Sequence, residues 1–195
     1  PAPKKPPPSA FAPTAALAEL TADTPGSAGV PPEPFEDLPE GTLLAGRYHL
    51  SALVGHGGMG AVYAAHDGDL DEDIALKVLR PDLGRDADFQ RRLKAEVRLA
   101  RRVSHPNVSR VHDIGVDDEL VFVTMELVRG HTLRERLAET IAGRAEPLEL
   151  AQIVDIVVQI GSALSAAHRA GVIHRDVKPD NVILAGGRAV LTDFG

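Results

Sequence analysis

The feature that most constrains this chain is an abrupt change of composition near residue 40. Eleven of its fifteen prolines lie in residues 1–40, and three of these prolines are consecutive at positions 6–8. Proline lacks a backbone donor and large apolar side chains are scarce in this segment, so the segment cannot readily build a core. We therefore predict a disordered linker over residues 1–40, although a proline-rich tract can also dock on a partner domain.

Charge and cysteine content exclude several classes of function. The chain of 195 residues carries a net charge of -7, which argues against a general binder of nucleic acid or of an anionic membrane. It contains no cysteine, so disulfide frameworks and thiolate zinc sites are excluded. With 44% hydrophobic residues, it has enough apolar material for one folded domain after the linker.

The most apolar stretch, residues 148–170, does not have the pattern of a membrane span. Gln152, Asp155, Gln159 and Ser162 interrupt it every three to four positions, which predicts the polar stripe of a soluble helix. The start of the chain lacks the basic-then-apolar order of a signal peptide. We expect a soluble, cytoplasmic chain with no membrane segment of its own, and this is compatible with an anchor elsewhere in a longer protein.

The chain after the linker begins with strand patterns. Short apolar segments bounded by Gly, Asp or Pro predict strands at residues 49–53, 61–65, 74–79 and 120–125. Before the last of these, apolar residues recur every three or four positions from Phe89 to Val103 and predict an amphipathic helix. Asp86 or Asp88 is the expected cap at its start, and the pair Pro106-Asn107 is expected to close it.

Helix patterns follow the strands. Thr132 and Glu135 have the spacing of a capping box and predict the start of a short helix. A long helix is predicted over residues 148–170, and Gly171 is suited to end it because glycine readily adopts the left-handed conformation. Strands first and helices second predict an α+β protein in two lobes.

A glycine-rich motif, G-H-G-G-M-G, occupies residues 55–60. Glycines at this spacing allow a backbone to approach phosphate oxygens closely. A Walker A loop requires Lys-Ser/Thr after the last glycine, where this chain has Ala61-Val62, and a Rossmann loop requires a helix where residues 62–64 predict a strand. The remaining class is a glycine-rich hairpin folded over a nucleotide, with a plain flexible hairpin as the alternative.

Lys77 lies within the apolar strand predicted at residues 74–79. A lysine in this setting usually reaches toward solvent, but it can also bind nucleotide phosphates if a carboxylate holds it in place. Glu96 is the expected partner, because it lies on the inward face of the predicted helix, where an unpaired acid is costly. Arg92, four residues earlier on that helix, is a competing partner for Glu96.

The most specific motif reads H-R-D-V-K-P-D-N at residues 174–181, in a predicted loop after the long helix. A D-F-G motif follows at residues 193–195. Together with the glycine-rich hairpin and the lysine in the apolar strand, in this order, these motifs resemble the protein kinase family. The lysine two residues after Asp176, Lys178, is similar to the one found in serine/threonine protein kinases. The glycine-rich hairpin resembles the hairpin of bacterial members of that type.

The resemblance implies a kinase-like α+β fold in two lobes. Residues 48–127 correspond to an antiparallel-sheet N-lobe with one helix, and residues 128–195 correspond to an incomplete, mainly helical C-lobe that ends at D-F-G. The activation segment and later helices of the family are not represented. Arg175, which normally meets a phosphorylated activation loop in this family, is therefore expected to have no partner. The apolar face of the helix at 148–170 is expected to be exposed. The histidine and phenylalanine of the two motifs are expected to pack rather than to catalyse.

The resemblance also implies a nucleotide site. The glycines Gly55, Gly57 and Gly60 would cover the ATP phosphates, and Lys77, held by Glu96, would bind the α- and β-phosphates. An adenine pocket is implied as well. Its members are the roof residues Val54, Val62 and Ala75, the floor residue Ile183, the gatekeeper Met125, and the hinge residues Glu126 and Val128.

The resemblance also implies catalytic and metal-binding roles for four residues near the end of the chain. Asp176 would accept or orient the proton of the substrate hydroxyl, and Lys178 would neutralise the transferring phosphoryl group. Asn181 and Asp193 would bind Mg²⁺, with Mn²⁺ as an alternative, through hard oxygen ligands. The expected function is a serine/threonine protein kinase that transfers the γ-phosphate of ATP to a protein hydroxyl. The alternative is a catalytically inactive kinase fragment or a nucleotide-binding regulatory module.

Overall fold

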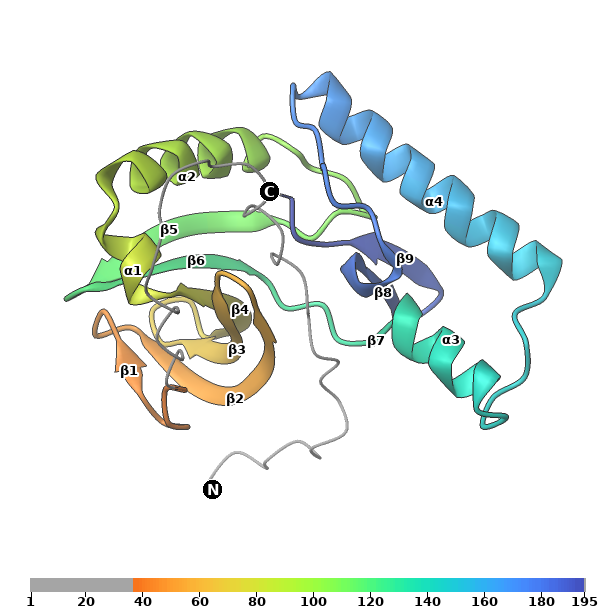
Figure 1. The fold of residues 1–195 in the computed structure, drawn as a ribbon, viewed down its shortest axis with the longest axis horizontal. Coiled ribbons are helices and arrows are strands. Elements are labelled where there is room, and N and C mark those ends of the chain that lie inside the picture. Colours follow the sequence, from red (N-terminus) through yellow and green to blue (C-terminus); the bar gives the residue numbers. More distant parts are fainter. Residues whose placement is uncertain (1–36, 195) are drawn as a thin grey trace, which may run out of the picture.

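The computed structural model describes residues 37–194, and most of the predicted linker lies outside them. The first lobe is a six-stranded, fully antiparallel sheet (Figure 1). In spatial order its strands are β1 (Leu43–Leu44), β2 (Tyr48–Gly57), β3 (Gly60–Asp67), β4 (Glu72–Leu79), β6 (Leu120–Glu126) and β5 (Val111–Asp117). All four predicted strands are confirmed, and β1 and β5 were not predicted.

The sheet buries apolar side chains on both faces because successive residues of a strand point to opposite sides. On β3, Tyr63 belongs to one buried cluster, whereas Val62 belongs to another that also contains Val97 of the helix above the sheet. Leu38 packs against the first cluster, and its N–H donates to the Tyr63 hydroxyl at 3.0 Å. The packed part of the chain therefore begins a few residues before β1, inside the range predicted as linker.

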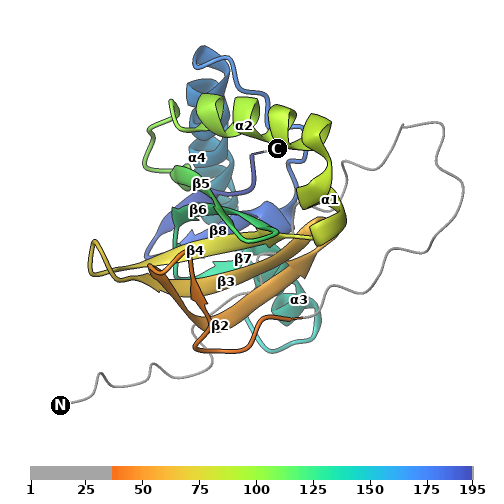
Figure 2. The same cartoon turned by 90° about the vertical axis from the view of Figure 1, so that its left-hand side faces the viewer.

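Two helices lie along one side of this sheet, α1 (Pro81–Arg85) and α2 (Ala87–Ala100), as Figure 2 shows. The predicted cap of α2 is Asp86, whose carboxylate accepts hydrogen bonds from the Asp88 and Phe89 amides at 2.8 and 3.1 Å. The predicted end at Pro106-Asn107 is wrong, because α2 ends at Ala100. Beyond Ala100 the chain turns more tightly, with Val103 N–H donating to the Ala100 carbonyl at 3.0 Å, and Val103 packs in the cluster that contains β9.

The second lobe combines a three-stranded sheet with helices. Its elements are β7 (His131–Thr132), α3 (Leu133–Ile141), α4 (Leu150–Arg169), the 3₁₀ turn Pro179–Asn181, β8 (Val182–Ala185) and β9 (Arg188–Leu191). The predicted capping box at the start of α3 is confirmed, with Glu135 N–H donating to the Thr132 hydroxyl at 3.1 Å and Thr132 N–H donating to the Glu135 carboxylate at 2.8 Å. The α+β class and the two-lobed arrangement are confirmed.

Helix α4 packs on one side only. Ala163 and Ala167 are fully buried in the cluster that contains β9, and Gly171, at φ 79°, follows the helix as predicted. By length and composition alone, α4 is the one helix of residues 37–194 that could cross a membrane, which is weak evidence for a span. The opposite face of α4 is exposed. Its large apolar residues are Leu150, Ile153, Val154, Val157 and Val158, which are 44 to 76% exposed.

The exposed face of α4 predicts self-association of this 195-residue chain, because burial of apolar surface contributes about 25 cal/mol per Å². The double substitution Val154→Glu with Val158→Lys removes apolar area and adds a favourable i,i+4 pair. We expect it to reduce binding of an apolar fluorescent dye and to shift sedimentation toward the monomer, without lowering the melting temperature. A wild-type chain that is monomeric and binds no dye contradicts this prediction.

Candidate active site

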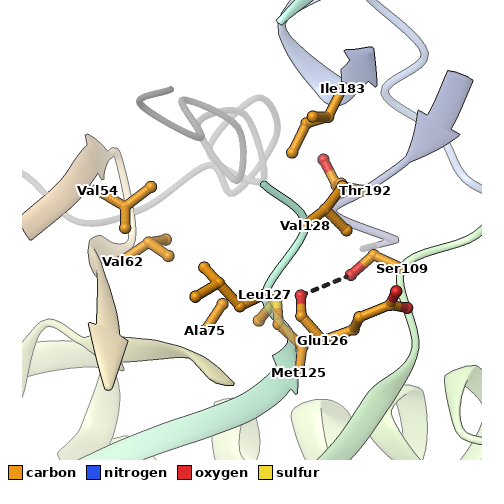
Figure 3. A pocket seen from close by; sticks show the side chains of 10 residues that line it. All are labelled: Val54, Val62, Ala75, Ser109, Met125, Glu126, Leu127, Val128, Ile183 and Thr192. Carbon is orange, nitrogen blue, oxygen red and sulfur yellow. Dashed lines mark hydrogen bonds between the residues drawn. The ribbon is translucent and has the colours of Figure 1, made fainter. Parts of the chain in front are cut away.

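A pocket lies where the two lobes meet, beside the segment that connects β6 to the second lobe (Figure 3). Its lining residues are Val54, Val62, Ala75, Ser109, Met125, Glu126, Leu127, Val128, Ile183 and Thr192. The structure thus brings together all seven residues of the predicted adenine pocket. Ser109, Leu127 and Thr192 line it too and were not predicted from the sequence.

Strand pairing explains why these distant residues share one pocket. Ala75 on β4 and Met125 on β6 are directly opposite in the sheet, and Val62 on β3 is opposite Gly55 on β2. The floor residue, Ile183, is 3% exposed and comes from β8 of the other lobe. The pocket therefore has apolar walls from both lobes, which suits a flat ring system.

The glycine-rich motif is a β-hairpin, as predicted, since Gly57 and Gly60 pair across a two-residue turn. A side chain at Gly60 would place its Cβ 1.9 Å from the Val78 carbonyl oxygen, so this glycine is required for close packing on β4. Met59, at the tip, is 5% exposed and packs with Leu79 and Val121. The tip is therefore anchored in the lobe, which argues against the alternative of a plain flexible hairpin.

Lys77 is buried and does not extend to solvent. Its side chain is 2% exposed, and its Nζ lies 3.8 Å from Oδ1 of Asp193. Burial lowers the pKa of Lys77 to about 8, and the nearby Asp193 carboxylate opposes this shift. For the same reason, burial raises the pKa of Asp193 to about 6, against the influence of Lys77. The two groups form an ion pair that is almost entirely removed from water.

The predicted ion pair between Lys77 and Glu96 is not present in the structure. Glu96 instead accepts a hydrogen bond from Nη1 of Arg175 at 3.2 Å, and the side chains of the pair are 37% and 61% exposed. Asp193 lies next to Lys77, in the position expected for Glu96. Arg175 was expected to lack a partner, and this expectation is also wrong.

The loop at residues 174–181 gathers three of the predicted catalytic groups. Oδ2 of Asp176 accepts hydrogen bonds from Nζ of Lys178 at 2.8 Å and from Nδ2 of Asn181 at 3.1 Å. The hydrogen bond from Lys178, followed by the one from Asn181, holds the pKa of Asp176 below its usual value. Asp176 is therefore ionised at neutral pH and able to accept a proton.

Four buried side-chain oxygens lack a hydrogen-bond partner among the described residues. One is Oδ2 of Asp180, and the other three belong to the two predicted metal ligands. These three are Oδ1 of Asn181 and both carboxylate oxygens of Asp193. Asn181 is fully buried, and its amide nitrogen is already used by Asp176, which orients Oδ1 away from that residue. Buried polar atoms without partners are rare, and hard oxygens of this kind are ligands of divalent cations. The oxygens of Asn181 and Asp193 therefore fit a divalent metal ion.

His174 and Phe194 pack together, as expected. Their ring centroids lie 4.5 Å apart, and Nε2 of His174 donates to the Thr192 carbonyl at 2.8 Å. Burial lowers the pKa of His174, so the ring is neutral and fixed. Asp193, between Thr192 and Phe194, adopts φ 59°, a conformation rare outside glycine, and these contacts hold it there.

The lowered pKa of Lys77 predicts a pH-dependent stability. Between pH 7.5 and 9.5 the unfolded chain keeps a proton on Lys77 that the folded chain releases, so the folded state gains stability as pH rises. Relative to Lys77→Met, the free energy of unfolding of the wild type should increase by about 2 kcal/mol over this range, measured by urea denaturation. Lys94→Met, at an exposed lysine, is the control and should parallel the wild type. Parallel curves for Lys77→Met would refute the assignment.

Comparison with known proteins shows which family this chain matches. The family model for the protein kinase domain matches residues 48–195. Among curated proteins, the chain is 38% identical over 156 residues to the serine/threonine-protein kinase PrkC of Bacillus subtilis, which covers 80% of this chain and 23% of PrkC. It is 45% identical over 157 residues to the serine/threonine-protein kinase PknE of Mycobacterium bovis, covering 80% of this chain and 27% of PknE.

Solved structures agree with this comparison. The crystal structure of the Mycobacterium tuberculosis PknI kinase domain matches with a TM-score of 0.70 at 34% identity, over 81% of this chain and 61% of that chain. The present chain spans about a quarter of the length of PrkC and PknE. Members of the family use ATP and a divalent metal ion. On the family match, the relatives and the structural likeness together, the chain belongs to the protein kinase family, and its relatives are bacterial serine/threonine-protein kinases.

Proposed function

We propose that this chain carries the nucleotide-binding and catalytic groups of a serine/threonine protein kinase, which transfers the γ-phosphoryl group of ATP to a protein hydroxyl. The observation that carries the proposal is the convergence of Asp176, Lys178 and Asn181 in one loop opposite the buried Lys77 and Asp193. Phosphoryl transfer requires positioning and neutralisation of negative charge more than covalent chemistry. Two lysines, two oxygen ligands and one base supply these requirements.

In this proposal the pocket holds the adenine ring of ATP. Val54, Val62 and Ala75 cover one face of the ring, and Ile183 covers the other. The main chain of Glu126 and Val128 offers hydrogen bonds to the edge of the base. The apolar character of the walls supports this assignment, since stacking surfaces from two lobes fit a planar base better than a charged group.

The phosphates then lie under the glycine-rich hairpin, close to Lys77. Gly55 and Gly57 leave the hairpin backbone open to phosphate oxygens, and Gly60 fixes the hairpin on β4. Asn181 and Asp193 would hold Mg²⁺, for which Mn²⁺ is the alternative. When bound, the metal ion neutralises charge on the phosphates. Lys77 is paired with Asp193, and a nucleotide would supply further negative partners to this buried cation.

Asp176 acts on the acceptor hydroxyl. Its carboxylate accepts or orients the hydroxyl proton as the substrate oxygen forms a bond to the γ-phosphorus, while the bond from that phosphorus to the ADP oxygen breaks. The low pKa of Asp176 supports the role of acceptor, because the group is ionised before the reaction. Lys178, 2.8 Å from Asp176, lies where it can balance charge on the transferring group.

A second candidate function has one specific observation in its favour. Glu96 pairs with Arg175 and not with Lys77, so the carboxylate that was expected to steady Lys77 is engaged elsewhere. A chain fixed in this arrangement would be a nucleotide-binding regulatory module, or an inactive kinase fragment. The intact set of catalytic groups favours the first candidate.

Nucleotide binding is tested by thermal unfolding of the chain with and without Mg²⁺-ATP. Ligand at about 100 times its dissociation constant should stabilise the folded state by roughly 2.7 kcal/mol, which corresponds to several degrees in melting temperature. Lys77→Met should remove most of this shift, because it deletes the cation that faces the phosphates. A wild type without a shift, or an equal shift in both proteins, contradicts the proposed site.

The role of Asp176 is tested by transfer of labelled γ-phosphate to a serine/threonine peptide library. Asp176→Asn should lower kcat about 10²- to 10⁴-fold, the usual contribution of general-base catalysis, and leave ATP affinity nearly unchanged. Asp180→Asn, at a carboxylate of the same loop that pairs with Arg134, is the matched control and should change kcat by less than about threefold. Near-normal turnover in Asp176→Asn would show that another group takes the proton.

A further inference from the structure

The walls of the pocket carry three polar side chains, and two of these form their hydrogen bonds to groups outside the hinge. The Glu126 carboxylate accepts from the Arg110 amide at 3.2 Å, and the Thr192 hydroxyl donates to the Asn181 carbonyl at 3.3 Å. The third is Ser109, whose hydroxyl points toward the Glu126 carbonyl oxygen (Figure 3). In a mostly apolar pocket, the few polar groups determine which ligand fits.

The backbone around Ser109 is fixed by its neighbours. Its N–H donates to the Leu191 carbonyl at 2.9 Å, and Leu191 N–H donates to the Asn107 carbonyl at 2.8 Å, so this segment is tied to β9. The next residue, Arg110, accepts a hydrogen bond from Glu126 N–H at 2.8 Å. The backbone of Ser109 is therefore held between the hinge and the second lobe.

The Ser109 hydroxyl has unused capacity for hydrogen bonding. The distance from its Oγ to the Glu126 carbonyl oxygen is 3.3 Å, which is long for a bond of this type. A hydroxyl that donates one proton keeps two acceptor lone pairs, and Ser109 is only 5% exposed, so bulk water reaches it poorly. An acceptor of this kind, buried at a pocket wall, suits an N–H group of a ligand.

We propose that Ser109 is a specificity-determining residue of this pocket, which accepts a hydrogen bond from the exocyclic amine of a purine base. The proposal rests on the proposed nucleotide site and names a feature of its substrate class. The hydroxyl donates to the Glu126 carbonyl and accepts from the amine, so it ties the base to the hinge. Bases without this amine leave the acceptor lone pairs of the buried hydroxyl unused and lose affinity.

The test compares two nucleotides by calorimetric titration of the full chain in Mg²⁺ buffer. One is ATP, and the other is purine riboside triphosphate, which lacks the 6-amino group. Ser109→Ala should weaken ATP binding about five- to tenfold, the value of one hydrogen bond, and should change binding of the second nucleotide less than about twofold. Val54→Ala, which removes only apolar contact from the roof, is the control and should weaken both nucleotides by the same factor.

Each outcome decides the proposal. A loss confined to ATP in Ser109→Ala supports it, because a purely structural role of Ser109 would affect both nucleotides alike. An equal loss for both nucleotides, or no loss for either, overturns it. A wild-type chain that binds neither nucleotide overturns the proposed function, and the role of Ser109 with it. A wild type that binds both equally, with Ser109→Ala unchanged, overturns the Ser109 proposal alone.

Discussion

The position of the site depends on a short backbone bridge between the lobes, which joins residues 107–109 to β9. Two backbone hydrogen bonds join Leu191 to Asn107 and to Ser109, and the Asn107 side chain donates to the Ala189 carbonyl at 2.9 Å. This bridge aligns the end of β9 with the first lobe. The residues that follow β9 therefore enter the site at a fixed position, and Asp193 lies beside Lys77 as a result.

The same bridge creates the unusual electrostatics of the site. Lys77 and Asp193 are both removed from water. Burial lowers the pKa of Lys77 and raises the pKa of Asp193, and each shift favours the neutral form of its group. Their mutual attraction only partly offsets the cost of burial. Together with Oδ1 of Asn181, they form a region where opposite charges and unpaired oxygens are already in place. A ligand with phosphates and a divalent cation would satisfy all of these groups together.

Much of this arrangement could be predicted from the sequence where local rules apply. The strands, the Asp86 cap and the capping box at Thr132 depend on neighbours within a few residues, and the glycine-rich hairpin could be separated from a helix by its own pattern. The residue that faces Lys77 could not be predicted. Periodicity places Glu96 on the inner face of α2, but it cannot show which distant carboxylate lies next to Lys77 in the folded chain. Ser109 was missed for a similar reason, since its place in the pocket depends on a bridge to Leu191.

The anchored tip of the glycine-rich hairpin has a mechanical consequence. Met59 shares its buried cluster with Phe89 and Leu93 of α2, and its carbonyl accepts a hydrogen bond from the Arg80 amide. The hairpin and α2 thus bear on the same set of side chains. A shift of α2 would therefore disturb the side chains that hold Met59, and with them the tip of the glycine-rich hairpin.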